Sequence, residues 1–218
     1  MNNDLIVVGA GGHSRVVLAI LSYYNNYNVI GVADSTSRSI GEKIDYTKIS
    51  YTWEDLSSLY DNGVKHAVIA IGDNKKRSTL FCQLKKIGFK FPNIIHPNAF
   101  VEKNAIFGSG NLITMGANIG SSVEIGNNCI IYGSTIEHET KIENNVFIAP
   151  SVSIAGRVKL GDSCFIGIGS SVVEKITIGK RATIGAGSVV IDNVGNDLTV
   201  AGIPAKSLGV NTNENGYK

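Results

Sequence analysis

Aliphatic residues recur at every sixth position through the second half of the chain. The regular positions are Ile142, Ile148, Ile154, Leu160, Ile166, Val172, Ile178, Ile184 and Val190. An α-helix repeats every 3.6 residues and an amphipathic strand every two, so a sustained period of six fits neither element alone. A coil with three short strands in each turn would satisfy it, because every third hexad then lies on the same wall. The pattern therefore predicts a parallel β-helix with a triangular cross-section.

The same period starts earlier in a different frame, with anchors at Val101, Phe107, Ile113, Ile119, Ile125 and Ile131. The next position in that frame holds Glu137, and the ladder resumes from Ile136 instead. One turn of the coil is therefore expected to be one residue short. The residues that follow this irregularity are Glu137, His138 and Glu139. The slip predicts a distorted corner close to a histidine that lies between two carboxylates.

The first 93 residues alternate apolar runs of strand composition with segments of helical spacing. The expected strands are 5–8, 29–33 and 67–71, and the expected helices are 15–21 and 75–86, with a short helix starting near Trp53. This order predicts a small α/β domain with a parallel sheet, similar to half of a Rossmann fold. We expect this domain over residues 1–93, the β-helix over 94–210, and a disordered polar tail over 211–218.

A glycine-rich turn, Gly9-Ala10-Gly11-Gly12-His13-Ser14, follows the first expected strand, and Asp34 follows the second. In nucleotide-binding α/β units such glycines let backbone N–H groups approach phosphate, and a later carboxylate binds ribose or base. Ser14 occupies the place of the third glycine of that motif, so a tight turn that only packs a helix on a strand is the alternative. His13 could equally be a polar residue facing solvent. Because the domain is too short for a complete dinucleotide fold, a mononucleotide or nucleotide-activated sugar is the expected ligand rather than NAD.

The composition is that of an ordinary globular protein, with 43% hydrophobic and 17% charged residues in a chain of 218. The net charge of +2 includes no long basic run, which argues against nucleic acid or an anionic membrane as the main partner. No apolar stretch approaches the length of a membrane span, and the N-terminal residues lack the features of a signal peptide. We therefore expect a cytoplasmic protein without membrane insertion.

Three cysteines, Cys82, Cys129 and Cys164, show neither the spacing of metal ligands nor that of a disulfide framework. Cys129 and Cys164 take the fifth place of a hexad, where small packing residues stand elsewhere, although a nucleophilic role is the alternative. No metal is expected.

His138 is the best candidate for a general base, because a carboxylate bonded to one ring nitrogen fixes the tautomer and raises the basicity of the other. The alternative is a solvated histidine at a corner of the coil.

Four segments together resemble one group of enzymes. They are Gly9-Ala10-Gly11-Gly12-His13, Ile94-Ile95-His96-Pro97, Ile136-Glu137-His138-Glu139 and Ala201-Gly202-Ile203-Pro204-Ala205-Lys206. The chain resembles the hexapeptide-repeat bacterial sugar acyltransferases, and in particular the sialic acid O-acetyltransferases and UDP-4-amino-sugar N-acetyltransferases. This resemblance implies a left-handed β-helix, a homotrimer, and acetyl-CoA as co-substrate between neighbouring coils.

The resemblance also implies roles for individual residues. His138 would be the base and Glu139 the residue that orients it, while the Gly156 N–H would hold the developing oxyanion. Ile168 and Ala186 would lie along the pantetheine arm. The substrate-binding residues implied for the activated sugar are Gly11, Gly12, His13 and Asp34.

Two departures from the family pattern concern the acceptor. Many relatives carry a second histidine nine residues after the base, where this chain has Phe147, and the short turn contains Tyr132-Gly133 where Asn-Thr is frequent. The function expected from the sequence is N-acetylation of a nucleotide-linked amino sugar, such as a UDP- or GDP-4-amino-4,6-dideoxy sugar of a surface polysaccharide. The alternatives are O-acetylation of sialic acid or another sugar, and an inactive β-helix that binds or scaffolds.

Overall fold

The computed structural model describes residues 3–210, and the chain divides into two compact units. The first contains the residues up to 72 together with 76–94, and the second contains 73–75 and the residues from 95 onward. The tail expected to be disordered, 211–218, lies outside the described residues.

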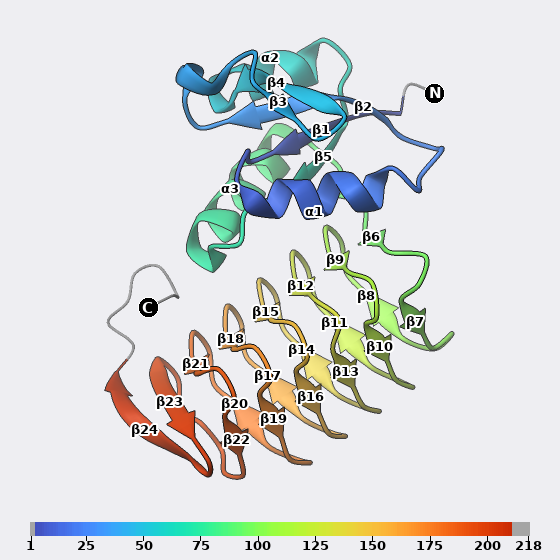
Figure 1. Cartoon of the computed structure of the whole chain (residues 1–218). Helices are drawn as coiled ribbons and strands as arrows, with labels where there is room; N and C mark the ends of the chain where they lie inside the picture. Colours follow the sequence, from blue (N-terminus) through green and yellow to red (C-terminus); the bar gives the residue numbers. More distant parts are fainter. Residues whose placement is uncertain (1–2, 211–218) are drawn as a thin grey trace. The chain divides into compact units, whose positions relative to one another are not determined.

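The first unit is built on a five-stranded sheet with the order β3-β4-β2-β1-β5. The strands are β1 (Asp4–Val8), β2 (Asn28–Asp34), β3 (Lys43–Ile44), β4 (Thr47–Thr52) and β5 (His66–Ile69). All neighbours pair in parallel except β3 and β4, which form an antiparallel hairpin at one edge. The sequence pattern did not predict this hairpin, because its polar residues hide the strand signal. The parallel α/β class predicted from the sequence is confirmed (Figure 1).

Three α-helices and two short 3₁₀ turns accompany this sheet. They are α1 (Gly12–Leu21), α2 (Leu56–Asp61), α3 (Asn74–Ile87), η1 (Ser37–Ser39) and η2 (Trp53–Asp55). Helix α3 buries Leu80, Phe81 and Leu84 in a core that also includes residues of β1, β2 and β5. It ends at Ile87, and the N–H of the following residue, Gly88, donates to the Leu84 carbonyl at 3.1 Å. The predicted strands and helices of this unit are all present, with boundaries shifted by up to three residues.

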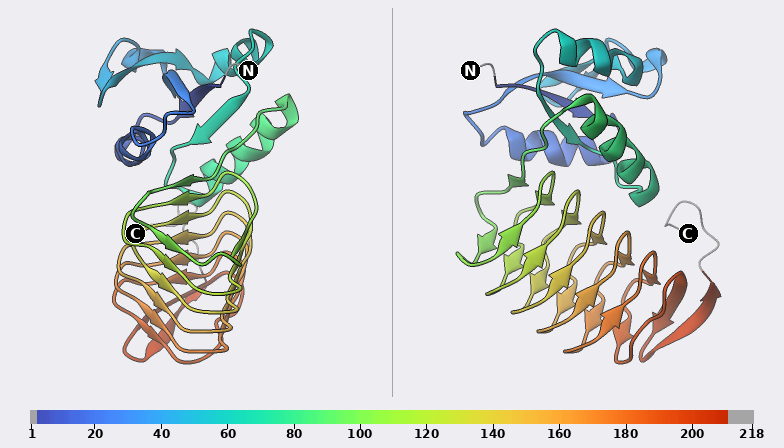
Figure 2. Two further views of the ribbon diagram at one scale, coloured as in Figure 1. Left: turned by 90° about the vertical axis from the view of Figure 1, so that its right-hand side faces the viewer. Right: turned by 180° about the vertical axis from the view of Figure 1, so that it is seen from behind.

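The second unit is a left-handed parallel β-helix whose short strands stack into three walls (Figures 1 and 2). All of these strands have two residues except the last two, β23 and β24, which pair antiparallel. The first wall contains β6 (Ile94–Ile95), β9 (Leu112–Ile113), β12 (Ile130–Ile131), β15 (Phe147–Ile148), β18 (Phe165–Ile166), β21 (Thr183–Ile184), β23 (Leu198–Gly202) and β24 (Ala205–Val210). The second wall contains β7 (Phe100–Val101), β10 (Asn118–Ile119), β13 (Thr135–Ile136), β16 (Ser153–Ile154), β19 (Ser171–Val172) and β22 (Val189–Val190). The third wall contains β8 (Ile106–Phe107), β11 (Glu124–Ile125), β14 (Lys141–Ile142), β17 (Lys159–Leu160) and β20 (Thr177–Ile178).

The sixth-residue anchors are the second residues of these strands, and they fill the interior of the coil. From Ile142 to Val190 every anchor is at most 3% exposed, and all of them belong to one hydrophobic core. The residue before each anchor points to the outer face, since neighbouring side chains of a strand alternate. Burial of an aliphatic anchor contributes roughly 1.5–3 kcal/mol, so the ladder is the main source of stability in this unit.

The walls meet at three corners, which we call the first corner (from first to second wall), the second corner (from second to third wall) and the third corner (from third to first wall). A regular corner has four residues. Its third residue has a positive φ, as at Ser122, Glu139, Arg157 and Lys175 of the second corner, with φ between 57° and 62°. The N–H of that residue donates to the carbonyl of the second residue in the preceding turn, as from Arg157 to His138 at 2.9 Å. This bond repeats from turn to turn and holds the corners in vertical register.

The short turn predicted from the ladder is confirmed by the strand register. Ile119 pairs with Ile136, whereas Ile136 pairs with Ile154, so the partners are 17 residues apart in the first case and 18 in the second. The missing residue belongs to the first corner, where Tyr132, Gly133 and Ser134 connect β12 to β13. None of these three residues is among those with positive φ in the described chain. A Cβ on Gly133 would lie 2.7 Å from the Met115 carbonyl oxygen, so only glycine fits the tightened corner.

Candidate active site

The residues predicted to bind a nucleotide lie at the carboxyl edge of the parallel sheet in the first unit. Gly11 precedes α1 as its N-cap and Gly12 is its first residue, and both are exposed. Asp34 ends β2, the strand beside β1, and its carboxylate accepts a hydrogen bond from the Ser35 N–H at 2.7 Å. The Ser14 side chain is buried and donates to the Gly11 carbonyl, so it closes the turn from within. The carboxyl edge, with the N-terminus of α1, is where parallel α/β sheets bind ligands.

His13 is half-buried in this region and differs from a solvated histidine. Burial and the nearby Arg77 guanidinium lower the pKa of His13 to about 4. Arg77 itself is 1% exposed, and its Nη1 donates to the carbonyls of Ile71 at 3.2 Å and Gly72 at 2.9 Å. His13 is therefore neutral at physiological pH, and a positive charge lies behind the turn expected to hold phosphate.

The free energy of unfolding of the first unit is expected to fall as the pH decreases from about 6.5 to about 4. In this interval the unfolded chain protonates His13 while the folded chain does not, so acid favours the unfolded state by roughly 1–3 kcal/mol. Urea unfolding followed by the fluorescence of Trp53, the single tryptophan of the chain, reports on this unit. His13→Gln should flatten the pH dependence; equal slopes in both proteins would contradict this prediction.

The candidate base lies at the second corner of the coil. His138 is the second residue of its corner and Glu139 the third, and His138 Nδ1 lies 3.0 Å from Glu139 Oε2. Hydrogen bonds from His138 and from Arg157 lower the pKa of the Glu139 carboxyl. The carboxylate is therefore charged and faces Nδ1 as a hydrogen-bond acceptor. A neutral ring that donates from Nδ1 carries no proton on Nε2. This is the arrangement that general-base catalysis by histidine requires.

Gly156 lies directly under the His138 ring, because it is the second residue of the same corner one turn later. A Cβ on Gly156 would lie 2.6 Å from His138 Nε2 and Cε1, and 3.1 Å from Nδ1. Only glycine leaves room for the ring in this position. The Gly156 N–H donates to no backbone carbonyl within residues 3–210. The base and the predicted oxyanion donor thus belong to one local site.

Arg157 was not identified from the sequence, although its spacing contained the information. It occupies the third place of its corner, 18 residues after Glu139, and its Nε donates to Glu139 Oε2 at 2.9 Å. Residues 18 apart stack in the regular part of a coil with this repeat. The stacking rule applied to Glu139 would have found the pair.

Ile168 and Ala186 lie together in an apolar groove of about 600 Å³ on the first wall and first corner. Three aromatic rings line it: the centroid of Phe147 lies 5.7 Å from that of Tyr132 and 5.2 Å from that of Phe165. Ile168 is 54% exposed, so its side chain is available to a ligand. Phe147, at the position where the family resemblance implies a second histidine, is part of this aromatic lining.

The base and the groove lie at different corners of one coil. His138, Glu139 and Gly156 are at the second corner, whereas the groove extends along the first wall and first corner, and the second wall separates them. The short turn also belongs to the first corner, with Tyr132 in the groove. The shortened turn, which the sequence places before Glu137 and His138, is therefore part of the groove and is separated from the His138 corner by strand β13.

Both halves of the chain match known family models. Residues 4–84 match the model described as the PglD N-terminal domain, and residues 157–192 match that of the bacterial transferase hexapeptide repeat. PerB from Caulobacter crescentus, solved with CoA and GDP-perosamine, superimposes with a TM-score of 0.88 at 29% identity, over 94% of this chain and 97% of that one. The resemblance to the hexapeptide-repeat sugar acyltransferases is thus confirmed in both units.

Two further relatives of this acyltransferase are similar over most or half of its length. The acetyltransferase domain of PglB from Neisseria gonorrhoeae has a TM-score of 0.90 at 29% identity, over 95% of this chain and all of that one. UDP-N-acetylbacillosamine N-acetyltransferase from Bacillus subtilis is 32% identical over 111 residues. That match spans half of this chain and half of the curated relative. The family and fold class predicted from the sequence are confirmed.

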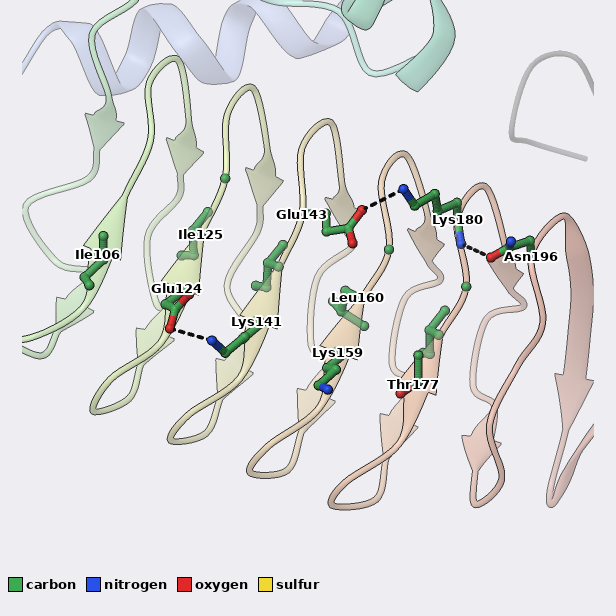
Figure 3. A pocket seen from close by; sticks show the side chains of 15 residues that line it. Ile106, Glu124, Ile125, Lys141, Glu143, Lys159, Leu160, Thr177, Lys180 and Asn196 are labelled. Atoms are coloured by element: carbon green, nitrogen blue, oxygen red, sulfur yellow. Dashed lines mark hydrogen bonds and ion pairs between the residues drawn. The ribbon is translucent and has the colours of Figure 1, made fainter.

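A second cavity, of about 580 Å³, lies on the third wall of the acyltransferase (Figure 3). Its outer face carries ion pairs between neighbouring turns, from Lys141 to Glu124 at 2.8 Å and from Lys180 to Glu143 at 3.6 Å. These charges are about half exposed, so each pair contributes little to stability.

The cysteines of the acyltransferase fit a structural role. Cys129 and Cys164 are fully buried at the third corner, and burial raises the pKa of Cys164 well above that of a free thiol. A thiol held in this state is a poor nucleophile. Within residues 3–210, no three side chains of His, Cys, Asp or Glu gather closely enough to hold a metal ion, and no helix has the length and apolarity of a membrane span.

Proposed function

We propose that this acyltransferase transfers the acetyl group of acetyl-CoA to the amino group of a nucleotide-linked amino sugar. Residues 1–93 would hold the activated sugar and residues 94–210 would bind acetyl-CoA and carry out the transfer. The names of the relatives and the ligands in their solved structures support this assignment. The Bacillus protein is named as a UDP-sugar N-acetyltransferase, and PerB and PglB were solved with CoA and GDP-perosamine or with acetyl coenzyme A.

The observation that carries the proposal is the His138 ring, held at Nδ1 by Glu139 and resting on Gly156. In the proposed reaction His138 Nε2 removes a proton from the sugar amine as its nitrogen attacks the thioester carbonyl. The C–N bond forms, the C–S bond breaks, and the proton passes to the departing CoA thiolate. No covalent enzyme intermediate is required, which agrees with the buried, protonated Cys164.

The Gly156 N–H would stabilise the oxyanion of the tetrahedral intermediate, a contribution of roughly 3–4 kcal/mol in enzymes that use one such donor. Ile168 and Ala186 would contact the pantetheine arm, whose apolar methylene groups suit the aromatic groove.

The acceptor would be held by Gly11, Gly12, His13 and Asp34, with phosphate at the N-terminus of α1 and base or ribose at Asp34. Neutral His13 can donate or accept a hydrogen bond, and the buried Arg77 adds a favourable positive potential for a diphosphate. The preferred sugar is a 4-amino-4,6-dideoxy sugar linked to UDP or GDP.

The separation of base and groove supports a homotrimer. A single coil presents them at different corners, so a complete site would combine the second corner of one subunit with the first corner and groove of the next. In a closed ring of three copies this head-to-tail contact occurs three times.

Complementation between a variant with a damaged groove and a variant without the base, assayed at acetyl-CoA far below the raised KM, tests this arrangement. Ile168→Glu should raise the KM for acetyl-CoA by about tenfold or more, because it places a charge in an apolar groove. His138→Ala should abolish proton transfer. Mixed trimers formed by co-expression should recover activity, with about a quarter of the interfaces intact if the subunits assort at random. Absence of recovery, despite mixed trimers detected by native mass spectrometry, would place the whole site in one subunit.

The reaction itself is tested by the release of CoA thiol across a panel of UDP- and GDP-linked 4-amino sugars and free sialic acid. Release with an amino sugar, and an N-acetyl product in the mass spectrum, supports the proposal. Release with sialic acid alone would make the protein an O-acetyltransferase. A protein that neither releases thiol nor binds acetyl-CoA would be a scaffold.

A further inference from the structure

Two side chains from successive turns meet on one carboxylate oxygen at the second corner. Glu139 Oε2 lies 3.0 Å from His138 Nδ1 and accepts from Arg157 Nε at 2.9 Å. The same oxygen therefore holds both the ring and the guanidinium. A carboxylate fixed by two donors on one oxygen has less freedom to rotate than one held by the ring alone.

The coil itself sets the position of Arg157 relative to Glu139. Both are third residues of their corners, with φ of 62° and 59°, and the Arg157 N–H donates to the His138 carbonyl at 2.9 Å. The strands on either side are in register, with Ile136 opposite Ile154 and Ile142 opposite Leu160. The backbone of Arg157 is thus hydrogen-bonded directly to His138, and its guanidinium contacts the carboxylate that holds the His138 ring.

We propose that Arg157 is a positioning residue that fixes the tautomer of His138 through Glu139. When the Glu139 carboxylate accepts a hydrogen bond from Nδ1–H, the proton of the neutral ring stays on Nδ1. Nε2, next to Gly156, then remains unprotonated and can accept a proton from the substrate. The Glu139 side chain is about half exposed. Without Arg157 it would therefore populate rotamers in which its carboxylate no longer accepts the hydrogen bond from Nδ1. The ring then samples the tautomer with the proton on Nε2, which cannot accept a proton from the substrate.

The other charged groups of this corner do not replace Arg157. Glu137 is the first residue of the corner and precedes His138 in the chain. In the following turn Lys175 occupies the same third place, with φ of 62°, but its Nζ pairs with Glu174 at 3.2 Å. Lys175 is therefore a matched control with the same backbone conformation and charge but a different partner.

The ion pair is not expected to matter for stability. The side chains of His138, Glu139 and Arg157 are each about half exposed, and exposed pairs contribute little to folding. Its effect is orientation, so the test must report on the ring rather than on the melting temperature. Asparagine is the chosen replacement, because it tolerates positive φ and carries no charge.

The test is a ¹⁵N spectrum of histidine-labelled protein at about pH 8.5, where an ordinary imidazole is neutral. The chain has four histidines, and the His138 signals are assigned by their loss in His138→Asn. In the wild-type protein we expect His138 with its proton on Nδ1. Arg157→Asn should shift the population toward the proton on Nε2, Arg157→Lys should retain most of the original tautomer, and Lys175→Asn should leave it unchanged.

Kinetics supply the second measurement. Arg157→Asn is expected to lower kcat by about 3- to 10-fold with the KM of both substrates nearly unchanged, since Glu139 itself remains. Arg157→Lys should recover most of the loss. Identical wild-type and Arg157→Asn tautomers, or a wild-type ring protonated on Nε2, would overturn the proposal.

This inference rests on the proposed function only where it treats His138 as the base. The spectra need no substrate, so they can refute the role of Arg157 in an active enzyme. A wild-type protein that acetylates no acceptor refutes the proposed function, whatever tautomer the spectra show.

Discussion

Replacement of His138 by alanine is expected to lower kcat by about 10²- to 10⁴-fold, the range found for the loss of a general base. The side chain is about half exposed and belongs to no hydrophobic core, so its removal should leave the coil intact. Turnover is measured as CoA thiol release at saturating acetyl-CoA and amino sugar, and folding by circular dichroism and thermal unfolding.

The matched control is Ser121→Ala, which changes the second residue of the same corner one turn earlier. Ser121 lies outside the pair of His138 and Glu139, so kcat should change by less than about twofold. Turnover of His138→Ala within a factor of a few of the wild-type value would remove His138 from the mechanism.

Gly156→Ala is the second substitution for which we expect a large effect, through a single methyl group. The added Cβ would lie 2.6 Å from His138 Nε2, which is closer than non-bonded atoms approach. The ring is the end of a flexible, half-exposed side chain and can swing away, so the fold should tolerate the change. The displaced base should lower kcat by about 100-fold, since a shift of about 1 Å in a catalytic group has effects of this size.

A double-mutant cycle separates displacement of the ring from other effects of the methyl group. Thermal unfolding is measured for the wild-type protein, Gly156→Ala, His138→Ala and the combined variant. Any loss of stability on Gly156→Ala should disappear in the His138→Ala background, where the ring is absent. If Gly156→Ala keeps full activity, the ring does not act from the position above Gly156.

The regular part of the fold could be predicted because its repeat is local. An inward aliphatic residue at every sixth position, and the resulting burial of Ile142 through Val190, depend only on the geometry of one hexad repeated along the chain. The short turn was visible for the same reason, as a break in the ladder between Ile131 and Ile136. In the first unit, the hairpin of β3 and β4 escaped prediction because its polar residues do not alternate clearly with apolar ones.

The site was predicted in pieces, each from its own motif. The sequence pointed to His138 with Glu139, and the resemblance to Gly156, Ile168 and Ala186. Neither said that Gly156 makes space for the ring, or that Ile168 and the base lie at different corners. Those facts depend on which residues stack 18 apart and which wall each hexad occupies, so they combine positions far apart in the chain.

By itself, the sequence determined a coil of hexads with one short turn, preceded by a half-Rossmann sheet, since hydrophobic periodicity is a property of neighbouring residues. Only the tertiary structure decided that the shortened turn at Tyr132 lies in the aromatic groove and at a different corner from the base. It also showed that Arg157 and His138 contact the same oxygen of Glu139. The physical reason is that side-chain contacts between turns depend on vertical register, which the hydrogen bonds of the stacked corners set across the whole coil.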